Sequence, residues 1–267
     1  MVDLKRFTEA NRGAWNAAMP YHRKARDSFW NDRLADPDFI FVQEPELGAL
    51  LKIGIKDQDI AHLCCNNGLE LISLKRLGAR RCVGFDICDE AIRDAVMRSE
   101  RFGTPVEFHR TDVYDLSEEF NASFDLVYIT IGALAWLPDL SGFFRVARKL
   151  LRQRGILFLY DSHPFTAMLP DQQPAADEQI CLAHSYFPSG YLKHNDSLDY
   201  YDHAAYEAPD TYEFLHTLSE IFGAILANAF RITGFQEFDH DISNLFPWAQ
   251  KSGLSLPLCY ILVAQAG

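Results

Sequence analysis

Residues 59–88, DIAHLCCNNGLELISLKRLGARRCVGFDIC, constrain the fold more than any other segment of the chain. They contain a short apolar run, a turn that ends in Gly68, an apolar helical face that ends at Gly78, and a second apolar run that closes on Asp86. Short apolar runs bounded by turn residues are typical of strands buried on both faces. The segment therefore predicts the first strand–helix–strand unit of a doubly wound α/β fold, whose crevice binds a nucleotide-like ligand.

The alternation of strands and helices continues as far as Asp161. The predicted strands are 60–65, 81–87, 105–109, 124–132 and 155–161. Helices are predicted at 3–27, at 45–53, at 89–103 with Asp89 as the expected cap, and around 143–150. Connections of this kind are right-handed and give a parallel sheet. We expect an α/β fold with a doubly wound, mostly parallel seven-stranded sheet (Rossmann-like) and an antiparallel C-terminal strand.

The pattern changes after Asp161. Residues 164–198 contain four prolines and no helical period, and eight aromatic residues lie between 186 and 214. Two strands are predicted at 199–208 and 211–216, joined by a turn at Pro209-Asp210. Thr217 and Glu220 have the spacing of a capping box that begins a helix. Strands at 234–240 and 258–265 are predicted to close the chain.

A chain of 267 residues with 48% hydrophobic content is long enough for one large core. We interpret it as a single domain over 1–267. Its predicted parts are an N-terminal helical lead-in (1–56), a core that holds the crevice (57–163), an inserted cap (164–216) and a C-terminal helix with strands (217–267).

The composition excludes several classes of partner. A net charge of −12 argues against binding along a nucleic-acid backbone, which needs clustered Lys and Arg. There is no apolar run long enough to span a membrane, and the N-terminus is too polar for a signal peptide. The six cysteines form no CxxC pair, and most lie in apolar runs, which favours a reducing cytoplasm. A homodimer is possible.

The turn that ends in Gly68 also limits the ligand. A dinucleotide needs closely spaced glycines so that backbone amides approach a pyrophosphate, but the chain contains no GxG and no GxxxxGK[ST]. This disfavours a Rossmann oxidoreductase. One glycine followed by an acid at the end of the second strand suits a nucleoside without phosphate, because the acid bonds ribose hydroxyls.

Five segments, in this order, resemble the class I S-adenosylmethionine-dependent methyltransferases: HLCCNNG, VGFDI, RTDVYDL, FDLVYITIGALAWLPDL and RGILFLYDSHP. Together they cover about half of the chain. NRGAWN, SHP and TYEFLHTLSEIFGAIL are also similar to a bacterial, small-molecule-type subgroup. The resemblance implies a Rossmann-like fold, S-adenosyl-L-methionine (SAM) as cofactor, S-adenosyl-L-homocysteine (SAH) as product and a small-molecule substrate.

The resemblance also assigns residues to the cofactor. These are Cys64, Asn66 and Gly68 below its methionine part, Asp86 at the ribose hydroxyls, Ile87, Asp112 and Val113 around adenine, and Ile129 and Thr130 at the sulfonium and amino-acid end. The family commonly has an acid at position 62 and glycines at positions 64 and 66, where this chain has His62, Cys64 and Asn66. His62 is counted with the cofactor residues, although a core histidine is the simpler interpretation. Tyr21 is counted with them because, like Trp15, it could cover a ligand.

Catalytic candidates lie where the fifth strand ends, since open sheets place their sites at carboxyl ends. Asp161 and His163 occupy that position, and His163 is the preferred base because its ordinary pKa allows proton acceptance near neutrality. The alternative is a loop histidine that bonds its neighbours before Pro164. Further pocket candidates are Tyr128, Trp136, Tyr191 and His216. The histidines show neither HxxxH nor HxH spacing, so no metal is expected.

Two functions follow from these residues. The first is methyl transfer from SAM to an oxygen or nitrogen atom of a small molecule, beneath a cap rich in aromatic residues. The second is a catalytically silent protein that binds SAM or SAH without turnover, which the departures at positions 62, 64 and 66 motivate.

Overall fold

The computed structural model describes residues 4–170, 181–187, 190–199, 201–202 and 204–267. Its central sheet consists of β1 (Asp59–Leu63), β2 (Arg81–Asp86), β3 (Glu107–Arg110), β4 (Phe124–Thr130), β5 (Leu151–Ser162), β8 (Phe230–Phe238) and β9 (Cys259–Ala266). The strand order is β3-β2-β1-β4-β5-β9-β8. β9 pairs antiparallel with both β5 and β8, and the other pairs are parallel. The predicted fold class is therefore confirmed.

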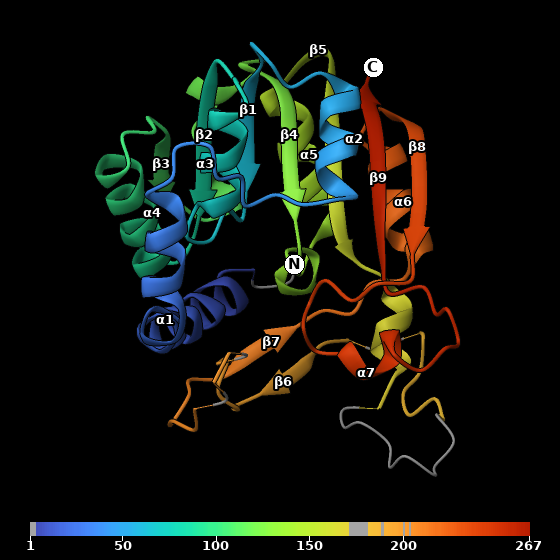
Figure 1. The fold of residues 1–267 in the computed structure, drawn as a ribbon. Helices are drawn as coiled ribbons and strands as arrows, with labels where there is room; N and C mark the ends of the chain where they lie inside the picture. The colour runs from blue at the N-terminus through green and yellow to red at the C-terminus, as the bar shows by residue number, and fades with distance from the viewer. Residues whose placement is uncertain (1–3, 171–180, 188–189, 200, 203) are drawn as a thin grey trace.

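Helices cover both faces of this sheet (Figure 1). They are α1 (Leu4–Leu34), α2 (Glu46–Ile53), α3 (Leu69–Arg76), α4 (Asp89–Arg101), α5 (Leu140–Leu150), α6 (Leu218–Ala227) and the short α7 (Pro247–Gln250). Side chains of α2 and α3 pack in the cluster on one face, and side chains of α5 and α6 pack on the other. Among the described residues, no helix combines the length and the apolar character needed to cross a membrane.

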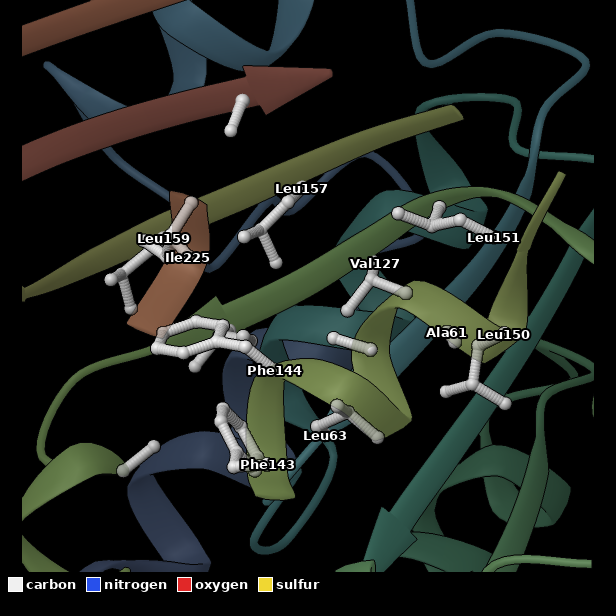
Figure 2. Close-up of a cluster of buried hydrophobic side chains, with 14 of the residues drawn as sticks. Ala61, Leu63, Val127, Phe143, Phe144, Leu150, Leu151, Leu157, Leu159 and Ile225 are labelled. Carbon is white, nitrogen blue, oxygen red and sulfur yellow. The ribbon is translucent and has the colours of Figure 1, made fainter. Parts of the chain in front are cut away.

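The core follows from the alternation of side chains along the strands. Val127 and Ile129 of β4 point toward α5 and α6, whereas Leu126 and Tyr128 point toward α2 and α3. Figure 2 shows the first of these clusters, in which Phe143 and Phe144 of α5 lie against strand residues such as Val127. Because both faces are covered, the strands are apolar almost throughout, as the sequence predicts for a parallel sheet.

The structure corrects several predicted boundaries. β8 begins at Phe230 rather than at 234 and ends at Phe238. α1 continues past residue 27 to Leu34, because Leu34 is buried in a cluster with residues of α3. β5 begins at Leu151 rather than at 155, directly after α5. The N-terminal cap of α4 is Cys88, whose Sγ accepts from the Ala91 backbone N at 3.4 Å. Asp89 cannot cap because its carboxylate accepts from side chains of α1.

The inserted segment contains a small second sheet of β6 (Leu192–His194) and β7 (Thr211–Glu213), which pair antiparallel. β7 falls within the predicted strand 211–216, but its partner is β6 rather than 199–208. The described residues of 199–208 form no strand, because the Asp199 carboxylate accepts three backbone N–H groups, including that of Ala204 at 2.9 Å, and turns the chain. Residues 171–180, 188–189, 200 and 203 of the predicted cap lie outside the described residues.

The helix predicted after the cap is confirmed together with its capping box. Thr217 Oγ1 accepts from the Glu220 backbone N at 3.2 Å, and the Glu220 carboxylate accepts from the Thr217 backbone N at 2.8 Å. The reciprocal bonds satisfy two N–H groups that a helix start leaves without partners.

Candidate functional site

The candidate site lies where the strand order reverses, at the carboxyl ends of β1 and β4 (Figure 1). Three acids lie at the carboxyl ends of strands on this side of the sheet: Asp86 is the last residue of β2, Asp112 follows β3, and Asp161 is the second-to-last residue of β5. Burial, and then the negative charges of these three acids, raise the pKa of the Cys64 thiol. The turn after β1 is thus surrounded by carboxyl groups, and the Cys64 thiol stays protonated.

The turn of residues 64–68 adopts left-handed backbone at three positions. The φ angles are 57° at Cys64, 45° at Asn66 and 77° at Gly68. A Cβ atom at Gly68 would lie 2.6 Å from Phe108 Cζ, so glycine is required there for space as well as for conformation. Left-handed backbone costs roughly 1–2 kcal/mol for an ordinary residue and less for Asn. The chain therefore keeps the turn of the glycine-rich motif without its first two glycines.

Asp86 joins the two loops that border the crevice. Its Oδ2 accepts from the Asn66 backbone N at 2.8 Å, and its Oδ1 accepts from the Cys88 backbone N at 2.8 Å. Burial raises the pKa of the carboxyl, and these N–H groups oppose the rise. An ionised carboxylate has about four acceptor sites, so both oxygens keep capacity for further donors such as hydroxyl groups.

Asp112 is held by α1, which lies along the edge where β2 and β3 end (Figure 1). Its Oδ2 accepts from Thr8 Oγ1 at 2.7 Å and from Lys5 Nζ at 2.9 Å, while its Oδ1 accepts from the Tyr114 backbone N. Val113 beside it is buried, and Ile87 after β2 is partly buried. The acid predicted for the adenine amino group is thus already engaged by two side chains of α1.

His62 is buried with one ring nitrogen satisfied. Its Nε2 lies 3.0 Å from Thr130 Oγ1, and its ring packs against Tyr128 with centroids 4.6 Å apart. Burial lowers the pKa of the imidazole to about 3, so the ring is neutral. Its Nδ1 is buried without a hydrogen-bond partner in the described part of the chain. Ile129, predicted beside Thr130 at the cofactor, points its side chain into the cluster with α5 and α6.

The two predicted catalytic residues both have partners within the fold. Asp161 Oδ1 accepts from the Gly132 and Ser162 backbone N atoms at 2.6 and 2.8 Å, which holds the loop after β4. Burial raises the pKa of Asp161 to about 6. His163 Nδ1 accepts from the Phe165 backbone N at 3.0 Å and so caps a short 3-10 helix, as the alternative interpretation expects.

His163 is also paired on its other side. Its Nε2 lies 3.0 Å from Glu237 Oε1 of β8, and the side chain is 6% exposed. Burial lowers the pKa of the ring, and the Glu237 charge opposes this. With Nδ1 as acceptor, the neutral ring carries its proton on Nε2.

The remaining predicted pocket candidates make four separate sets of contacts. Trp136 meets Trp15 of α1 edge-on with centroids 5.4 Å apart, so this pair lies beside the loop after β4. Tyr21 stacks on Tyr206 of the inserted segment with centroids 4.4 Å apart. Tyr191 packs beside Phe7, Tyr212 and Phe214, and His216 Nε2 lies 2.9 Å from the Leu137 carbonyl oxygen.

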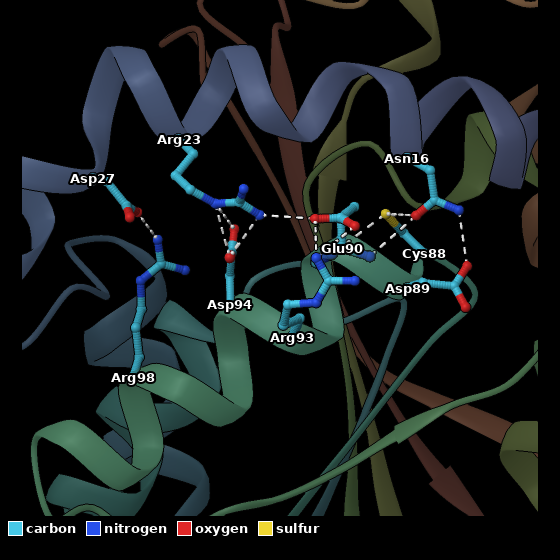
Figure 3. A network of polar contacts seen from close by, with 10 residues as sticks. Asn16, Arg23, Asp27, Cys88, Asp89, Glu90, Arg93, Asp94 and Arg98 are labelled. Carbon is cyan, nitrogen blue, oxygen red and sulfur yellow. Dashed lines mark hydrogen bonds and ion pairs between the residues drawn. The ribbon is translucent and has the colours of Figure 1, made fainter.

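α1 also carries a set of polar side chains that join the site to its surroundings. Asn11 Nδ2 donates to the Tyr212 carbonyl at 2.8 Å, and the Tyr212 backbone N donates to Asn11 Oδ1 at 2.7 Å. Asn16 accepts from the Glu90 backbone N at 3.1 Å (Figure 3). These roles were not predicted, although both asparagines lie in the NRGAWN segment that supports the resemblance.

The charges at the site suit a cationic nucleoside such as SAM. Asp86 and Asp161 accept backbone N–H groups, and in the described residues neither carboxylate contacts a cationic side chain. Asn66 Oδ1 is buried in the turn without a hydrogen-bond partner among the described residues. Carboxylates without counter-charges and a spare acceptor suit a ligand that carries positive charge and hydroxyl groups. The residues present therefore fit the group.

Known methyltransferases are similar to this chain over the segment that contains the candidate site. The family model described as a methyltransferase domain matches residues 60–155. A ubiquinone biosynthesis O-methyltransferase of Xanthomonas euvesicatoria pv. vesicatoria is 34% identical over 95 residues, which are 36% of this chain and 39% of that protein. The chain thus spans about two fifths of the length of the curated relatives it matches.

Solved structures match over nearly the whole chain. An S-adenosylmethionine-dependent methyltransferase from Mesorhizobium loti is 19% identical with a TM-score of 0.60, over 82% of this chain and 97% of that one. The complex of DhpI with SAH is 15% identical with a TM-score of 0.59, over 98% of this chain and 97% of that one. At these identities the likeness shows the fold alone.

Proposed function

We propose, from the premise that this chain is a class I S-adenosylmethionine-dependent methyltransferase, that it transfers a methyl group from SAM to an oxygen or nitrogen atom of a small molecule. The observation that supports this most directly is the ring of strand-end carboxyls around the left-handed turn at Cys64. SAM supplies a methyl group already activated on a sulfonium, so the protein has to bind, orient and exclude water.

Each part of the site has a proposed task. Asp86 holds the ribose hydroxyls with its remaining acceptor sites, and Asn66 and Gly68 form the floor below the methionine part. Asp112 and Val113 border adenine, with Ile87 against its face. The ubiquinone relative methylates oxygen by its name, and we extend that reaction type to this chain.

A further set of residues closes the site. We propose that Thr130, with His62 behind it, meets the amino-acid end of the cofactor. The Trp15–Trp136 pair excludes water on the side of the acceptor, because Trp136 lies in the 3-10 helix that follows β4 and Trp15 of α1 packs against it. Ile129 stays a predicted cofactor residue, although its side chain packs in the cluster with α5 and α6.

Titration with SAH tests the proposal. We expect a binding heat and an upward shift of the melting temperature, because a ligand that binds only the native state stabilises it. Absence of both at millimolar SAH would exclude the proposed function. A matched titration with NAD should give neither signal.

The silent-binding alternative is favoured by His62, Cys64 and Asn66, which replace the family's acid and glycines. It predicts SAH binding without turnover. Incubation with labelled SAM and a panel of phenols, amines and carboxylic acids separates the two, since methyl release with any member of the panel eliminates the alternative.

The role of His163 as base stays a prediction, and Asp161 is proposed to assist by holding the loop beside it. Proton acceptance by His163 requires Nδ1 to release the Phe165 N–H bond. We expect His163→Asn, which keeps an acceptor for that N–H, to lower turnover by roughly 100-fold, as loss of a general base does, with unchanged SAH affinity. Normal turnover in this variant would leave His163 as a cap only.

Three predictions about the surroundings of the protein belong to the same proposal. The acidic charge favours a small-molecule substrate over a nucleic acid. A homodimer and a cytoplasmic location are proposed from the sequence. Sedimentation of the purified protein measures whether it is a homodimer. Microscopy of a tagged chain in its host cell shows whether it is cytoplasmic.

A further inference from the structure

The turn of residues 64–68 needs support that a glycine-rich turn does not need. Cys64 and Asn66 are both left-handed, a conformation that most side chains disfavour. Local bonds account for part of the support: the Cys65 backbone N donates to the Phe85 carbonyl at 3.0 Å, and the Gly68 backbone N donates to the Cys65 carbonyl at 3.0 Å. The carbonyl of Asn67 is bonded from outside the turn.

The outside donor is Arg98 of α4. Its Nη1 donates to the Asn67 carbonyl oxygen at 3.1 Å, and its Nη2 donates to Asp27 Oδ1 of α1 at 2.5 Å. Figure 3 shows the Arg98 and Asp27 side chains directed toward each other across the gap between the two helices. The planar guanidinium thus spans a carbonyl and a carboxylate at once, which an ammonium group does less well.

Burial of the Arg98 guanidinium costs free energy. The side chain is 3% exposed, and it lies on the same face of α4 as the buried Ala91 and Ala95. Its Nε is buried without a hydrogen-bond partner in the described part of the chain, beside a small cavity that Asn67 and Asp94 help to line. Burying a charge with an unused donor is unfavourable, so packing alone does not explain the arginine.

We propose that Arg98, anchored by Asp27, is a positioning residue that holds the cofactor-binding turn in the left-handed conformation which glycines provide elsewhere in the family. It acts through Asn67 and does not touch the cofactor. The proposal rests on the proposed function, because the shape of the turn affects binding only if SAM and SAH lie on it. Through Arg98, the turn keeps its left-handed conformation although positions 64 and 66 are Cys and Asn rather than glycine.

The test compares SAH dissociation constants, measured by calorimetry, in two backgrounds of the full-length chain. In the natural background, Arg98→Met should weaken SAH binding about tenfold, the size of one lost hydrogen bond to a charged group. In a background that carries Cys64→Gly and Asn66→Gly, the same change should weaken binding less than threefold, because glycine adopts left-handed backbone without support. Arg93→Met is the matched control, since Arg93 lies on α4 but is exposed and pairs only locally with Glu90.

The outcomes separate cleanly. An equal loss of affinity in both backgrounds, or no loss in either, overturns the proposal, because a purely structural arginine would not depend on the residues of the turn. If Arg98→Met does not fold, Asp27→Ala removes the carboxylate that anchors Arg98 and keeps the arginine, and the same dependence on the glycine background is expected. Failure of the natural protein to bind SAH would overturn the proposed function itself.

Discussion

Replacement of Asp86 by alanine is expected to weaken SAH binding by about 1–3 kcal/mol, the range for hydrogen bonds to a charged group. Two effects act together in this variant. The carboxylate that would hold the ribose hydroxyls is lost, and the Asn66 and Cys88 backbone N–H groups lose the acceptor that joins their loops. Calorimetric titration with SAH measures the change.

Two further variants control this experiment. Asp86→Asn keeps one acceptor oxygen without the charge, so it should fall between the natural protein and the alanine variant. Glu119→Ala removes an exposed acid from the 3-10 helix of Glu118–Phe120, which precedes β4, and should bind SAH normally. Unchanged affinity in Asp86→Ala would mean that the ribose lies elsewhere.

The second large effect concerns the stability of the fold at high pH. Glu46 begins α2, is 5% exposed, and accepts a hydrogen bond from the Tyr128 hydroxyl. Burial raises the pKa of Glu46 to about 8; the Tyr128 bond opposes this rise, and the charge of Glu70 adds to it. The carboxyl is therefore protonated in the folded protein at neutral pH, whereas in the unfolded chain it ionises near pH 4.5.

Because the folded protein holds this proton more tightly, the stabilisation is complete below about pH 4.5 and is lost as the pH rises through about 8. Glu46→Gln keeps an acceptor for Tyr128 but does not ionise. From pH 5 to pH 8 we expect the free energy of unfolding of the natural protein to fall relative to this variant, by up to about 1.4 kcal/mol per pH unit. Urea unfolding at several pH values measures this difference.

The exposed Glu44 offers a matched control two residues earlier. Glu44→Gln should follow the natural protein across the same pH range. If the curves of the natural protein and Glu46→Gln stay parallel from pH 5 to pH 8, the carboxyl is not held neutral and the interpretation of this buried pair is wrong.

The sheet could be predicted because its strands are buried on both faces and are therefore apolar runs with few interruptions, such as residues 126–129 and residues 60–63 with His62. The capping box at Thr217 could also be predicted, since both of its residues lie within one helical turn. The pairing of the strands in the cap could not be predicted. The Asp199 side chain accepts hydrogen bonds from nearby backbone N–H groups, and these bonds replace those that a strand at 199–208 would make.

The site was predictable where its residues follow strands, as Asp86 and Asp112 do. Their partners were not, because Thr8 lies 104 positions from Asp112, and Glu46 lies 82 positions from Tyr128. Only the fold brings such residues together, and no local period marks them. One feature of the sequence does point to Arg98: it is a charged residue on the apolar face of a predicted helix.

The paired hydrogen bonds between Asn11 and the backbone of Tyr212 have a consequence for engineering. They tie the first helix to the inserted segment, and the same helix contacts Asp112 through Thr8 and the start of α4 through Asn16, on the side where we propose that adenine lies. The inserted segment could be exchanged between relatives in order to alter the choice of methyl acceptor. Such an exchange would break the Asn11–Tyr212 hydrogen bonds unless α1 is exchanged as well. Asn11 and Tyr212 lie 201 positions apart in the sequence, and we expect that the two segments have to be exchanged together.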